Sequence, residues 1–224
     1  MVYVYHPPIL TVDAVIFQLM AGELNVLLIR RAKEPFEGSW ALPGGYNAAG
    51  DTTRDALARV LTTKVGIKPD DLPLIEQLYT FDTIGRDPRG DAVSVTYMGL
   101  GQKLELTTDA GLQNPTFFPL TKLPKLAYDH ADIVAYALDR LRSKVTYTNA
   151  IFALLSERFT MTQLQQAYEA VLGRSLDKRN FRKKMLGLDV LQATEDYYQD
   201  GAHRPALLYR FKKQDFQSLT GTVD

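Results

Sequence analysis

The pattern of hydrophobic residues changes near residue 145, and no single uniform architecture accounts for both parts of the chain. Before that point, apolar runs typical of strands alternate with two amphipathic helical segments. After it, three short helical segments are followed by two extended runs. The chain has 224 residues, which is more than one average domain needs and allows two. We therefore predict one domain at residues 1–145 and a second at residues 146–224.

The first 145 residues predict a mixed α/β domain. Two segments have the apolar spacing of helices, at residues 52–65, where Gly66 provides a C-terminal stop, and at residues 130–144. Other runs have the β-branched and apolar character of strands, and Gly22 marks a hairpin turn between the first two. These strand-like runs are Thr11–Met20, Asn25–Arg30, Leu74–Phe81, Asp91–Leu100 and Thr116–Leu120.

The remaining residues predict a smaller α+β domain. Helical patterns are followed by two extended runs, and a turn at Asp200–Gly201 joins those runs into a hairpin. The helical segments are Asn149–Glu157, Thr162–Leu172 and Lys178–Leu188, and the extended runs are Val190–Tyr198 and Leu207–Phe211. Three helices followed by a hairpin is the element order of a winged helix-turn-helix domain.

Composition excludes several classes of protein. The chain contains no cysteine, which excludes disulfides, thiolate metal sites and a cysteine nucleophile. Its first residues, MVYVYHPPIL, lack the basic region of a secretory signal. No apolar run approaches the roughly 20 residues that a membrane helix needs. We therefore expect a cytoplasmic protein with no membrane partner.

The formal net charge is zero, with 26 basic and 26 acidic side chains, which by itself argues against a nucleic-acid partner. The sum conceals an uneven distribution. Residues 1–145 carry a net charge of −2 (15 basic, 17 acidic), and residues 146–224 carry +2 (11 basic, 9 acidic). Within residues 174–184, six basic side chains stand against the single acidic residue Asp177. Overall neutrality therefore does not exclude binding to DNA.

A glycine-containing segment, SWALPGG at residues 39–45, precedes the first predicted helix with informative spacing. Five residues separate Gly45 from Asp51, and seven separate Asp51 from Arg59. The glycine and aliphatic residues that follow are Leu61, Gly66 and Ile67. This arrangement resembles the Nudix family, whose signature is G-x5-E-x7-R-E-U-x-E-E-x-G-U with U aliphatic. The resemblance implies an α/β Nudix fold, in which helices sandwich a mixed sheet.

The acidic residues of that signature are missing from this sequence. Asp51 stands where the first Glu belongs, and the three helix glutamates that bind divalent metal in the family correspond to Val60, Thr63 and Lys64. These three positions share one face of a helix, where carboxylates would bind Mg²⁺ and assist hydrolysis. Valine cannot ligate the ion, threonine does so weakly and lysine repels it. We therefore predict no metal site, no required cofactor, no catalytic residues and no metal-assisted hydrolysis.

Lys64 is the substitution that suggests a function. We hypothesise that its ammonium supplies the positive charge that a metal would have given, and that it holds a diphosphate without cleaving it. The alternative is a residue that only packs, which is our interpretation of Val60.

The loop YTFDTIGRDPRGDAVSVTYMGL and the segment EPFEGSWALPGG resemble the subset of Nudix proteins that handle ADP-ribose. Arg86 and Arg89 flank a turn in that loop, and their planar guanidinium groups suit phosphate or ribose oxygens. The alternative for both arginines is a solvated loop.

Aromatic residues near these segments are candidates for contact with adenine. Trp40 or Phe81 would stack on the base, and core packing is the alternative for each ring. The sequence does not decide whether Arg30 or the adjacent Arg31 faces the pocket. The predicted ligand-binding residues are Arg31, Trp40, Gly44, Gly45, Lys64, Phe81, Arg86 and Arg89.

The segment at residues 178–188 segregates its apolar and basic residues when it is arranged as a helix. Phe181, Met185 and Leu188 share the face that would pack on the core. The outward face would let Arg, Lys and Asn reach base edges, while flanking lysines reach phosphates. In this scheme Arg182 reads bases and Lys184 contacts the backbone. The predicted DNA-binding residues are Lys178, Arg179, Asn180, Arg182, Lys183, Lys184 and, at the hairpin tip, His203 and Arg204.

A Nudix-like domain without the acidic residues, followed by a winged helix, resembles the NrtR family of Nudix-related transcriptional regulators. The resemblance implies a homodimer on a palindromic double-stranded DNA operator. It further implies a repressor of NAD biosynthesis or salvage genes, with ADP-ribose as the effector ligand. Alternatives are an active ADP-ribose pyrophosphatase, a regulator of pentose catabolism, and an adaptor that uses the winged helix to bind protein.

Overall fold

A mixed sheet forms the centre of the first domain. The computed structural model describes residues 6–107, 114–199, 205–213 and 215–223. Within these residues, seven strands form one sheet in the order β3-β2-β1-β6-β5, with β4 paired to β1 and β7 paired to β2. Strands β1 and β6 are parallel, and the other pairs are antiparallel. The strands are β1 (Ile9–Met20), β2 (Glu23–Arg30), β3 (Trp40–Ala41), β4 (Gly44–Tyr46), β5 (Leu74–Phe81), β6 (Ala92–Gly101) and β7 (Thr116–Pro119).

The five strands predicted for this domain are confirmed, with ends that differ by two residues or fewer. Strands β3 and β4 were not predicted because they contain only two and three residues, too few to show a periodic pattern. Two short 3₁₀ helices, η1 (Pro69–Asp71) and η2 (Leu120–Lys122), complete the connections.

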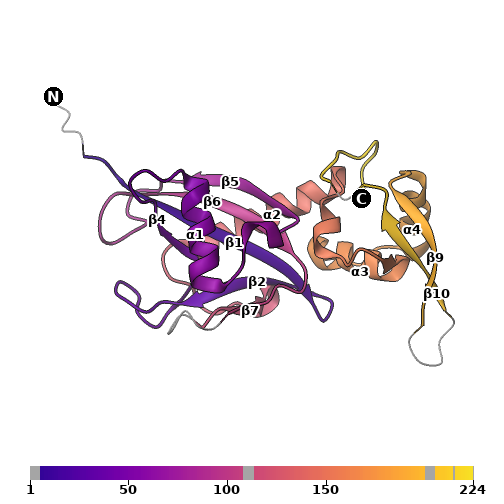
Figure 1. Cartoon of the computed structure of the whole chain (residues 1–224), viewed down its shortest axis with the longest axis horizontal. Helices are drawn as coiled ribbons and strands as arrows, with labels where there is room; N and C mark the ends of the chain where they lie inside the picture. The colour runs from indigo at the N-terminus through magenta and orange to yellow at the C-terminus, as the bar shows by residue number, and fades with distance from the viewer. Residues whose placement is uncertain (1–5, 108–113, 200–204, 214, 224) are drawn as a thin grey trace.

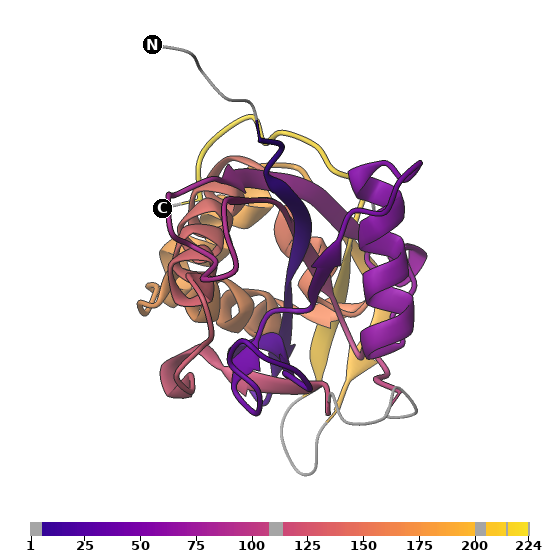
Figure 2. The ribbon, with the colours of Figure 1, turned by 90° about the vertical axis from the view of Figure 1, so that its left-hand side faces the viewer.

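Helices cover both faces of the sheet (Figures 1 and 2). Helix α1 (Thr53–Val65) packs on one face, and α2 (His130–Tyr147) packs on the other. Neighbouring residues of β1 contribute to opposite layers, because side chains alternate along a strand. Ile16 belongs to the apolar cluster with α1, whereas Phe17 belongs to the cluster with α2. This double burial explains why β1 is a nearly continuous apolar run and confirms the predicted sandwich.

Helix α1 has defined ends that the sequence specifies. Thr52 caps the N-terminus through a capping box with Asp55. Gly66 ends the helix at φ 78°, a left-handed conformation that glycine adopts without steric cost. The predicted stop at Gly66 is therefore confirmed. These two ends define the extent of α1, the helix that carries Lys64.

The second domain contains a three-stranded sheet in the order β8-β10-β9, with helices packed against it. Its elements are η3 (Ala150–Leu154), β8 (Phe159–Thr160), α3 (Met161–Leu172), α4 (Lys178–Gly187), β9 (Leu191–Tyr198) and β10 (Ala206–Phe211). The last two predicted helices and both hairpin strands are confirmed. The turn at Asp200–Gly201 lies outside the described residues.

The short helix predicted at residues 149–157 is confirmed only over Ala150–Leu154, where it is the 3₁₀ helix η3. The chain becomes extended at Leu155, so the predicted end at Glu157 is wrong. All five residues of η3 are buried, so the segment lacks the polar face of an amphipathic surface helix. Asn149, just before η3, exchanges backbone and side-chain hydrogen bonds with Gln217 in the C-terminal segment.

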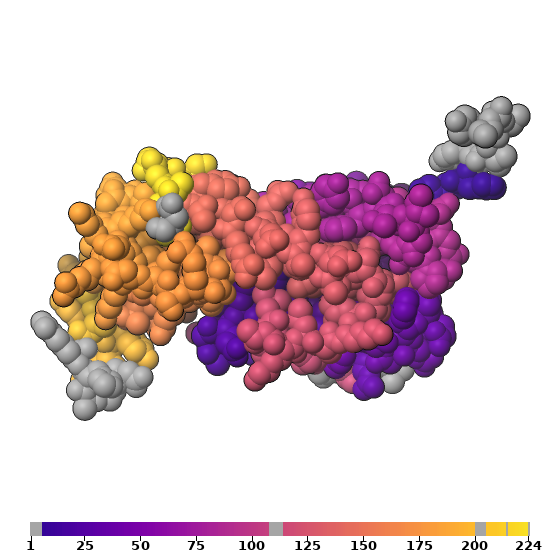
Figure 3. Space-filling model, turned by 180° about the vertical axis from the view of Figure 1, so that it is seen from behind, coloured from indigo at the N-terminus to yellow at the C-terminus, as the bar shows by residue number. Residues whose placement is uncertain are grey.

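One apolar cluster extends across the two parts of the chain, and α2 connects them. This helix continues to Tyr147, so the boundary predicted at residue 145 lies inside its last turn. A single buried cluster includes Leu28 of the first sheet and Tyr168 of α3. Figure 3 shows the second domain forming one end of an elongated molecule. Within the described ranges, none of the helices combines the length and apolar character that a membrane crossing requires.

Candidate functional site

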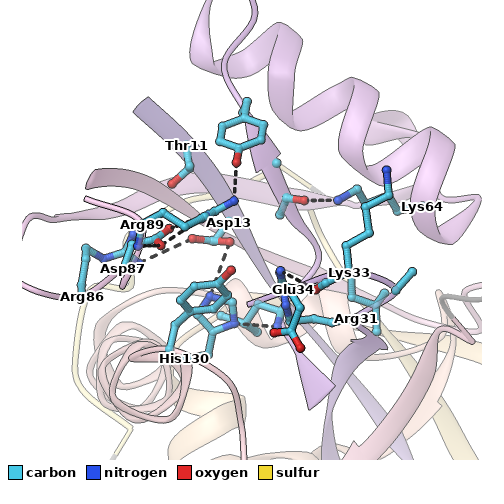
Figure 4. A pocket seen from close by; sticks show the side chains of 17 residues that line it. Thr11, Asp13, Arg31, Lys33, Glu34, Lys64, Arg86, Asp87, Arg89 and His130 are labelled. Atoms are coloured by element: carbon cyan, nitrogen blue, oxygen red, sulfur yellow. Dashed lines mark hydrogen bonds and ion pairs between the residues drawn. The ribbon is translucent and has the colours of Figure 1, made fainter. Parts of the chain in front are cut away.

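A cavity of about 460 Å³ opens beside the sheet of the first domain. It lies between α1, the loop after β2, the loop between β5 and β6, and the start of α2 (Figure 4). Its volume falls in the range of small-molecule sites, roughly 300–1,000 Å³. Six of the eight predicted ligand-binding residues line it, namely Arg31, Gly44, Gly45, Lys64, Arg86 and Arg89.

Arg86 forms a buried, bidentate ion pair beside this cavity. Its Nε and Nη2 donate to the two carboxylate oxygens of Asp129, at 2.9 and 2.8 Å. The Arg86 side chain is only 5% exposed, so the solvated-loop alternative is wrong for this residue. Asp129 immediately precedes α2, and the bidentate pair therefore fixes the β5–β6 loop to the start of that helix.

Arg89 lies nearer the cavity mouth and is about one-third exposed. Its Nε donates to Asp87 Oδ1 at 2.9 Å, and its Nη1 donates to the hydroxyl of Tyr46. The hydrogen bonds with Asp87 raise the pKa of Arg89, and those with Arg89 lower the pKa of the Asp87 carboxyl. Arg89 therefore carries a fixed positive charge beside the opening.

Asp13 lies at the centre of the cavity, and sequence reasoning missed it. Its buried carboxylate accepts a 2.6 Å hydrogen bond from Ser94 Oγ. Arg86 Nη2 and His130 Nε2 approach it at 3.8 and 3.7 Å. The available signal was a lone acidic residue inside the apolar run TVDAVIFQLM, because an unpaired carboxylate is rarely buried.

His130, the first residue of α2, is buried beside Asp13. The backbone N–H of Leu42 donates to its Nδ1 at 2.9 Å. Burial lowers the pKa of His130, while the charge of Asp13 raises it by less. An Nδ1 that accepts a hydrogen bond carries no proton, so the neutral ring must carry its proton on Nε2, which faces Asp13.

Glycine at positions 44 and 45 lets the backbone of β4 lie close to side chains of β1 and α1. A Cβ at residue 44 would lie 1.9 Å from Asp13 Oδ1, and a Cβ at residue 45 would lie 3.0 Å from Val60 Cγ2. Both residues belong to β4, which pairs with β1 so that Gly44 lies opposite Asp13. The absence of side chains keeps this wall of the cavity open.

Lys64 extends from α1 toward the same wall, and its Nζ donates to the Gly44 carbonyl oxygen. The side chain is half-buried. Burial lowers the pKa of Lys64, the carboxylate of Asp13 partly opposes this, and the charges of Arg31 and Arg59 lower it further. The ammonium is thus partly desolvated inside the cavity.

The α1 positions where the Nudix signature places metal ligands do not fit a divalent cation. Val60 is buried, and Thr63 donates its hydroxyl to the Arg59 carbonyl at 2.7 Å. Asp51 pairs with the guanidinium of Arg59 at 2.9 Å, which ties the loop before α1 to the helix. Among the described residues, no group of three His, Asp or Glu side chains is placed to hold a metal ion. At the third position, the cationic Lys64 would repel Mg²⁺, which binds oxygen ligands.

Two predicted contacts lie elsewhere. The Trp40 ring packs on Phe118, with centroids 4.7 Å apart, and Phe81 lies among Tyr79 and Tyr136. Neither ring lines the cavity, so core packing describes both, and the predicted stacking on adenine has no contact to support it. The aromatic residues that do line the cavity, which the sequence analysis did not select, are Tyr46 and Tyr128.

Arg31, rather than Arg30, faces the cavity. Its guanidinium carbon lies 4.9 Å from the centroid of the Tyr128 ring, and its Nε donates to the Pro35 carbonyl at 2.7 Å. Arg30 is exposed and donates to the Gly38 carbonyl at 3.0 Å. Arg30 is the last residue of β2 and Arg31 directly follows it, and side chains of neighbouring residues along an extended chain point to opposite sides.

Helix α4 exposes the basic surface that the sequence predicted. Phe181 and Met185 are buried, which confirms the predicted packing face, and Leu188 is partly buried. Arg182 is exposed and donates to the Tyr209 hydroxyl at 3.2 Å. Lys184 is half-buried. The other predicted DNA-binding residues of α4 are exposed, namely Lys178, Arg179, Asn180 and Lys183. His203 and Arg204 lie outside the described residues.

Comparison with known proteins matches both parts of the chain. Residues 8–137 match the family described as the NUDIX domain, and residues 151–211 match the NrtR DNA-binding winged helix domain. A protein of Acinetobacter baylyi named "ADPR responsive transcriptional repressor NtrR" is 38% identical over 218 residues, covering 95% of this chain and 85% of that protein. The chain belongs to the NrtR family of Nudix proteins.

Solved structures of the NrtR family have the same fold. The crystal structure of Shewanella oneidensis NrtR complexed with a 27mer DNA is 32% identical, with a TM-score of 0.81, and the match covers 96% of this chain and 99% of that one. The NUDIX domain of the same protein, in a cocrystal structure with ADP ribose, is 34% identical with a TM-score of 0.56, over 61% of this chain and 90% of that one. The predicted Nudix fold followed by a winged helix is confirmed.

The hydrogen bond from Leu42 to His130 predicts the protonation state of the imidazole. Nitrogen-15 NMR of the histidine rings should show His130 neutral, with its proton on Nε2, at pH 6.5, where an ordinary exposed histidine is about half protonated. Its pKa is lowered because the charged form is desolvated. Free imidazole in the same buffer is the reference. A His130 ring protonated on both nitrogens at pH 6.5 would contradict this geometry.

Proposed function

We propose that this chain is a DNA-binding transcriptional repressor whose affinity for its operator is controlled by ADP-ribose. The proposal combines a basic helix on the second domain with a cation-lined cavity in the first. The names of the similar proteins, which mention DNA and ADP-ribose, support both ligands. The family resemblance extends the proposal to a homodimer on a palindromic operator that controls NAD biosynthesis or salvage genes. DNA binding in turn implies a cytoplasmic protein.

The form of α4 supports binding in a DNA major groove. The helix contains 10 residues and is about 15 Å long at roughly 1.5 Å per residue, which suits one segment of the groove. The exposed guanidinium and amide groups of Arg179 and Asn180 have donors that match base edges. The ammonium of Lys183 suits phosphate contact. The acidic side chain of Asp177 is used to cap the helix, where it accepts from the Asn180 backbone.

The contents of the cavity support a ligand with phosphate groups. Five cationic side chains line it, compared with three carboxylates, and these are Arg31, Lys33, Lys64, Arg86 and Arg89 against Asp13, Glu34 and Asp87. A neutral His130 adds no charge of its own. ADP-ribose carries a diphosphate between two sugars, and the rings of Tyr46 and Tyr128 offer flat apolar surface for the remainder of the molecule.

The observation that carries regulation is the position of α2, which begins at the cavity and ends beside α3 of the second domain. Its 18 residues extend about 27 Å at roughly 1.5 Å per residue. At its start, His130 lines the cavity and Asp129 holds Arg86. Near its end, Arg142 Nε donates to the Val171 carbonyl of α3 at 3.1 Å. A ligand that moves the start of α2 would thus move the helix pair that presents the basic surface.

The end of α2 is also held firmly within the molecule. The buried ammonium of Lys144 lies 2.9 Å from Glu76 Oε2 of β5 and 4.5 Å from the ring centroid of Phe216. Backbone hydrogen bonds join Leu219 to Tyr147 and Val223 to Thr146. Because these contacts hold the last turns of α2 together, we infer that the helix transmits a displacement as a rigid element rather than by local fraying.

The residues of α1 support a first domain that does not hydrolyse its ligand. Val60, Thr63 and Lys64 offer no carboxylate, so the Mg²⁺-dependent attack of water on a diphosphate lacks its metal ligands. We therefore propose that the first domain binds ADP-ribose without cleaving it.

The proposed function predicts a DNA mobility shift that ADP-ribose reverses. The full chain should shift the DNA upstream of its own gene, and ADP-ribose should weaken that binding about 5- to 150-fold, the usual range of coupling between sites. A variant with Arg179→Ala and Lys183→Ala should lose the shift, because the outward face of α4 makes the contact. Binding of this DNA that ADP-ribose leaves unchanged would refute effector control.

The same preparation separates the proposed regulator from the pyrophosphatase alternative. Incubation with ADP-ribose and Mg²⁺ or Mn²⁺ should release no AMP. Rapid release of AMP would show that the substitutions in α1 do not abolish catalysis. Failure to shift any promoter DNA would instead favour the protein-binding adaptor.

Arg142 provides a test of the route through α2. Arg142→Ala removes the hydrogen bond to Val171, so ADP-ribose should weaken DNA binding less than in the unmodified chain, by about 0.5–2 kcal/mol of coupling free energy. Affinity for each ligand alone should change little. Arg140→Ala is the matched control, because Arg140 lies on the same helix and, among the described residues, its side chain forms a hydrogen bond and a cation–π contact with Tyr136 of that helix. Equal coupling in both variants would place the route elsewhere.

A further inference from the structure

The residues that follow the winged helix return to the junction between the two domains. Strand β10 ends at Phe211, and residues 215–223 then run antiparallel to residues 146–149, at the end of α2. Figures 1 and 3 show these residues, in yellow, at the surface where the two domains meet. We call residues 215–223 the return segment. By sequence it follows the second domain, but it is bound to the helix that begins at the cavity.

Asn149 attaches the return segment to the chain that follows α2. This residue is fully buried, and its Nδ2 donates to the Asp215 carbonyl at 3.0 Å. Its Oδ1 accepts from the Gln217 backbone N–H at 2.8 Å, and its own backbone N–H donates to the Gln217 carbonyl at 3.1 Å. A side-chain amide has a donor end and an acceptor end, and both are used here. These hydrogen bonds therefore define the register of the return segment against the end of α2.

The ring of Phe216 attaches the return segment beside the first sheet as well. Its centroid lies 4.5 Å from Lys144 Nζ, and the same ammonium lies 2.9 Å from Glu76 Oε2 of β5. The attraction between a cation and an aromatic ring is stronger where water is excluded, and Lys144 is buried. One ammonium on α2 therefore contacts both the first domain and the return segment.

The far end of the return segment lies against the end of α4. A Cβ at Gly221 would lie 3.3 Å from Leu188 Cδ2, and Leu188 is the residue that directly follows α4. Val223 is buried and belongs to the apolar cluster that also includes Phe181 and Met185 of α4. The position of the return segment therefore limits the position that α4 can take.

We propose that the return segment positions α4 relative to α2, with Asn149 and Phe216 as its positioning residues. The proposal rests on the DNA binding proposed above, because the fit of α4 to an operator depends on how that helix is held. The return segment also connects α2 to α4 without passing through Arg142 and α3. A displacement of α2 would thus reach α4 by two routes.

Pulsed electron paramagnetic resonance on the full chain measures this positioning without DNA or ADP-ribose. The chain contains no cysteine, so Ala135→Cys on α2 and Leu186→Cys on α4, both at exposed residues, provide two sites for spin labels. With only these two substitutions, the distance distribution between the labels should be narrow. Asn149→Ala and Phe216→Leu should each broaden it, because each removes contacts that hold the return segment. Phe216→Tyr, which keeps the aromatic ring, and the control Thr220→Ala, at an exposed residue of the same segment, should leave it narrow.

The same substitutions in the unlabelled chain should weaken control of DNA binding. The factor by which ADP-ribose weakens operator binding should fall about two- to thirtyfold in Asn149→Ala and Phe216→Leu, as expected for residues on a coupling route. Affinity for ADP-ribose alone should be unchanged, because both residues lie outside the cavity lining. Affinity for DNA of unrelated sequence should also be unchanged, because no basic residue is altered.

The outcomes separate the positioning of α4 from the proposed function. A distribution that stays narrow in both Asn149→Ala and Phe216→Leu would overturn the proposal, and a lower unfolding temperature would then show that the segment only adds stability. A broadened distribution with undiminished control by ADP-ribose would overturn it as well. If the chain without these substitutions binds no promoter DNA but the distribution still broadens, the positioning of α4 is supported and the DNA binding proposed above is overturned.

Discussion

The buried pair between Arg86 and Asp129 is the interaction on which the cavity and its connection to the second domain depend. Removing these charges from water costs several kcal/mol per ion, and the bidentate geometry offsets that cost only while both partners stay in place. The pair holds the β5–β6 loop against the start of α2 and brings Arg86 Nη2 to 3.8 Å from Asp13. Loss of either partner would leave an unpaired charge beneath the ligand. The pair therefore sets the position of α2 at the cavity.

From this pair, one helix leads to the surface proposed to bind DNA. Helix α2 packs on the sheet of the first domain and continues to the second, and one apolar cluster extends across both domains. A ligand that competes for Arg86 would shift the start of α2. Arg142 would carry that shift to α3, which packs against α4. Binding of ADP-ribose would therefore change DNA binding by moving α2, α3 and α4 together.

The sequence predicted the elements with strong periodicity and the motifs with fixed spacing, but it could not predict contacts between distant residues. The glycine segment and α1 placed Gly44, Gly45 and Lys64 together because their separation along the chain is short. Asp13 and His130 are 117 positions apart and meet only through sheet pairing and the packing of α2. For Trp40, the sequence left adenine stacking and core packing open for a similar reason, since its neighbour Phe118 lies on β7, whose position beside β2 no local pattern reveals.

The central claim is that ADP-ribose and DNA bind competing arrangements of one molecule, and linkage makes that claim measurable from the ligand side. The decisive measurement is the affinity for ADP-ribose of the free protein and of the protein saturated with operator DNA. ADP-ribose should bind the DNA complex more weakly than the free protein, by the same factor by which ADP-ribose weakens DNA binding. Equal affinity of ADP-ribose for the free and DNA-bound protein would contradict it.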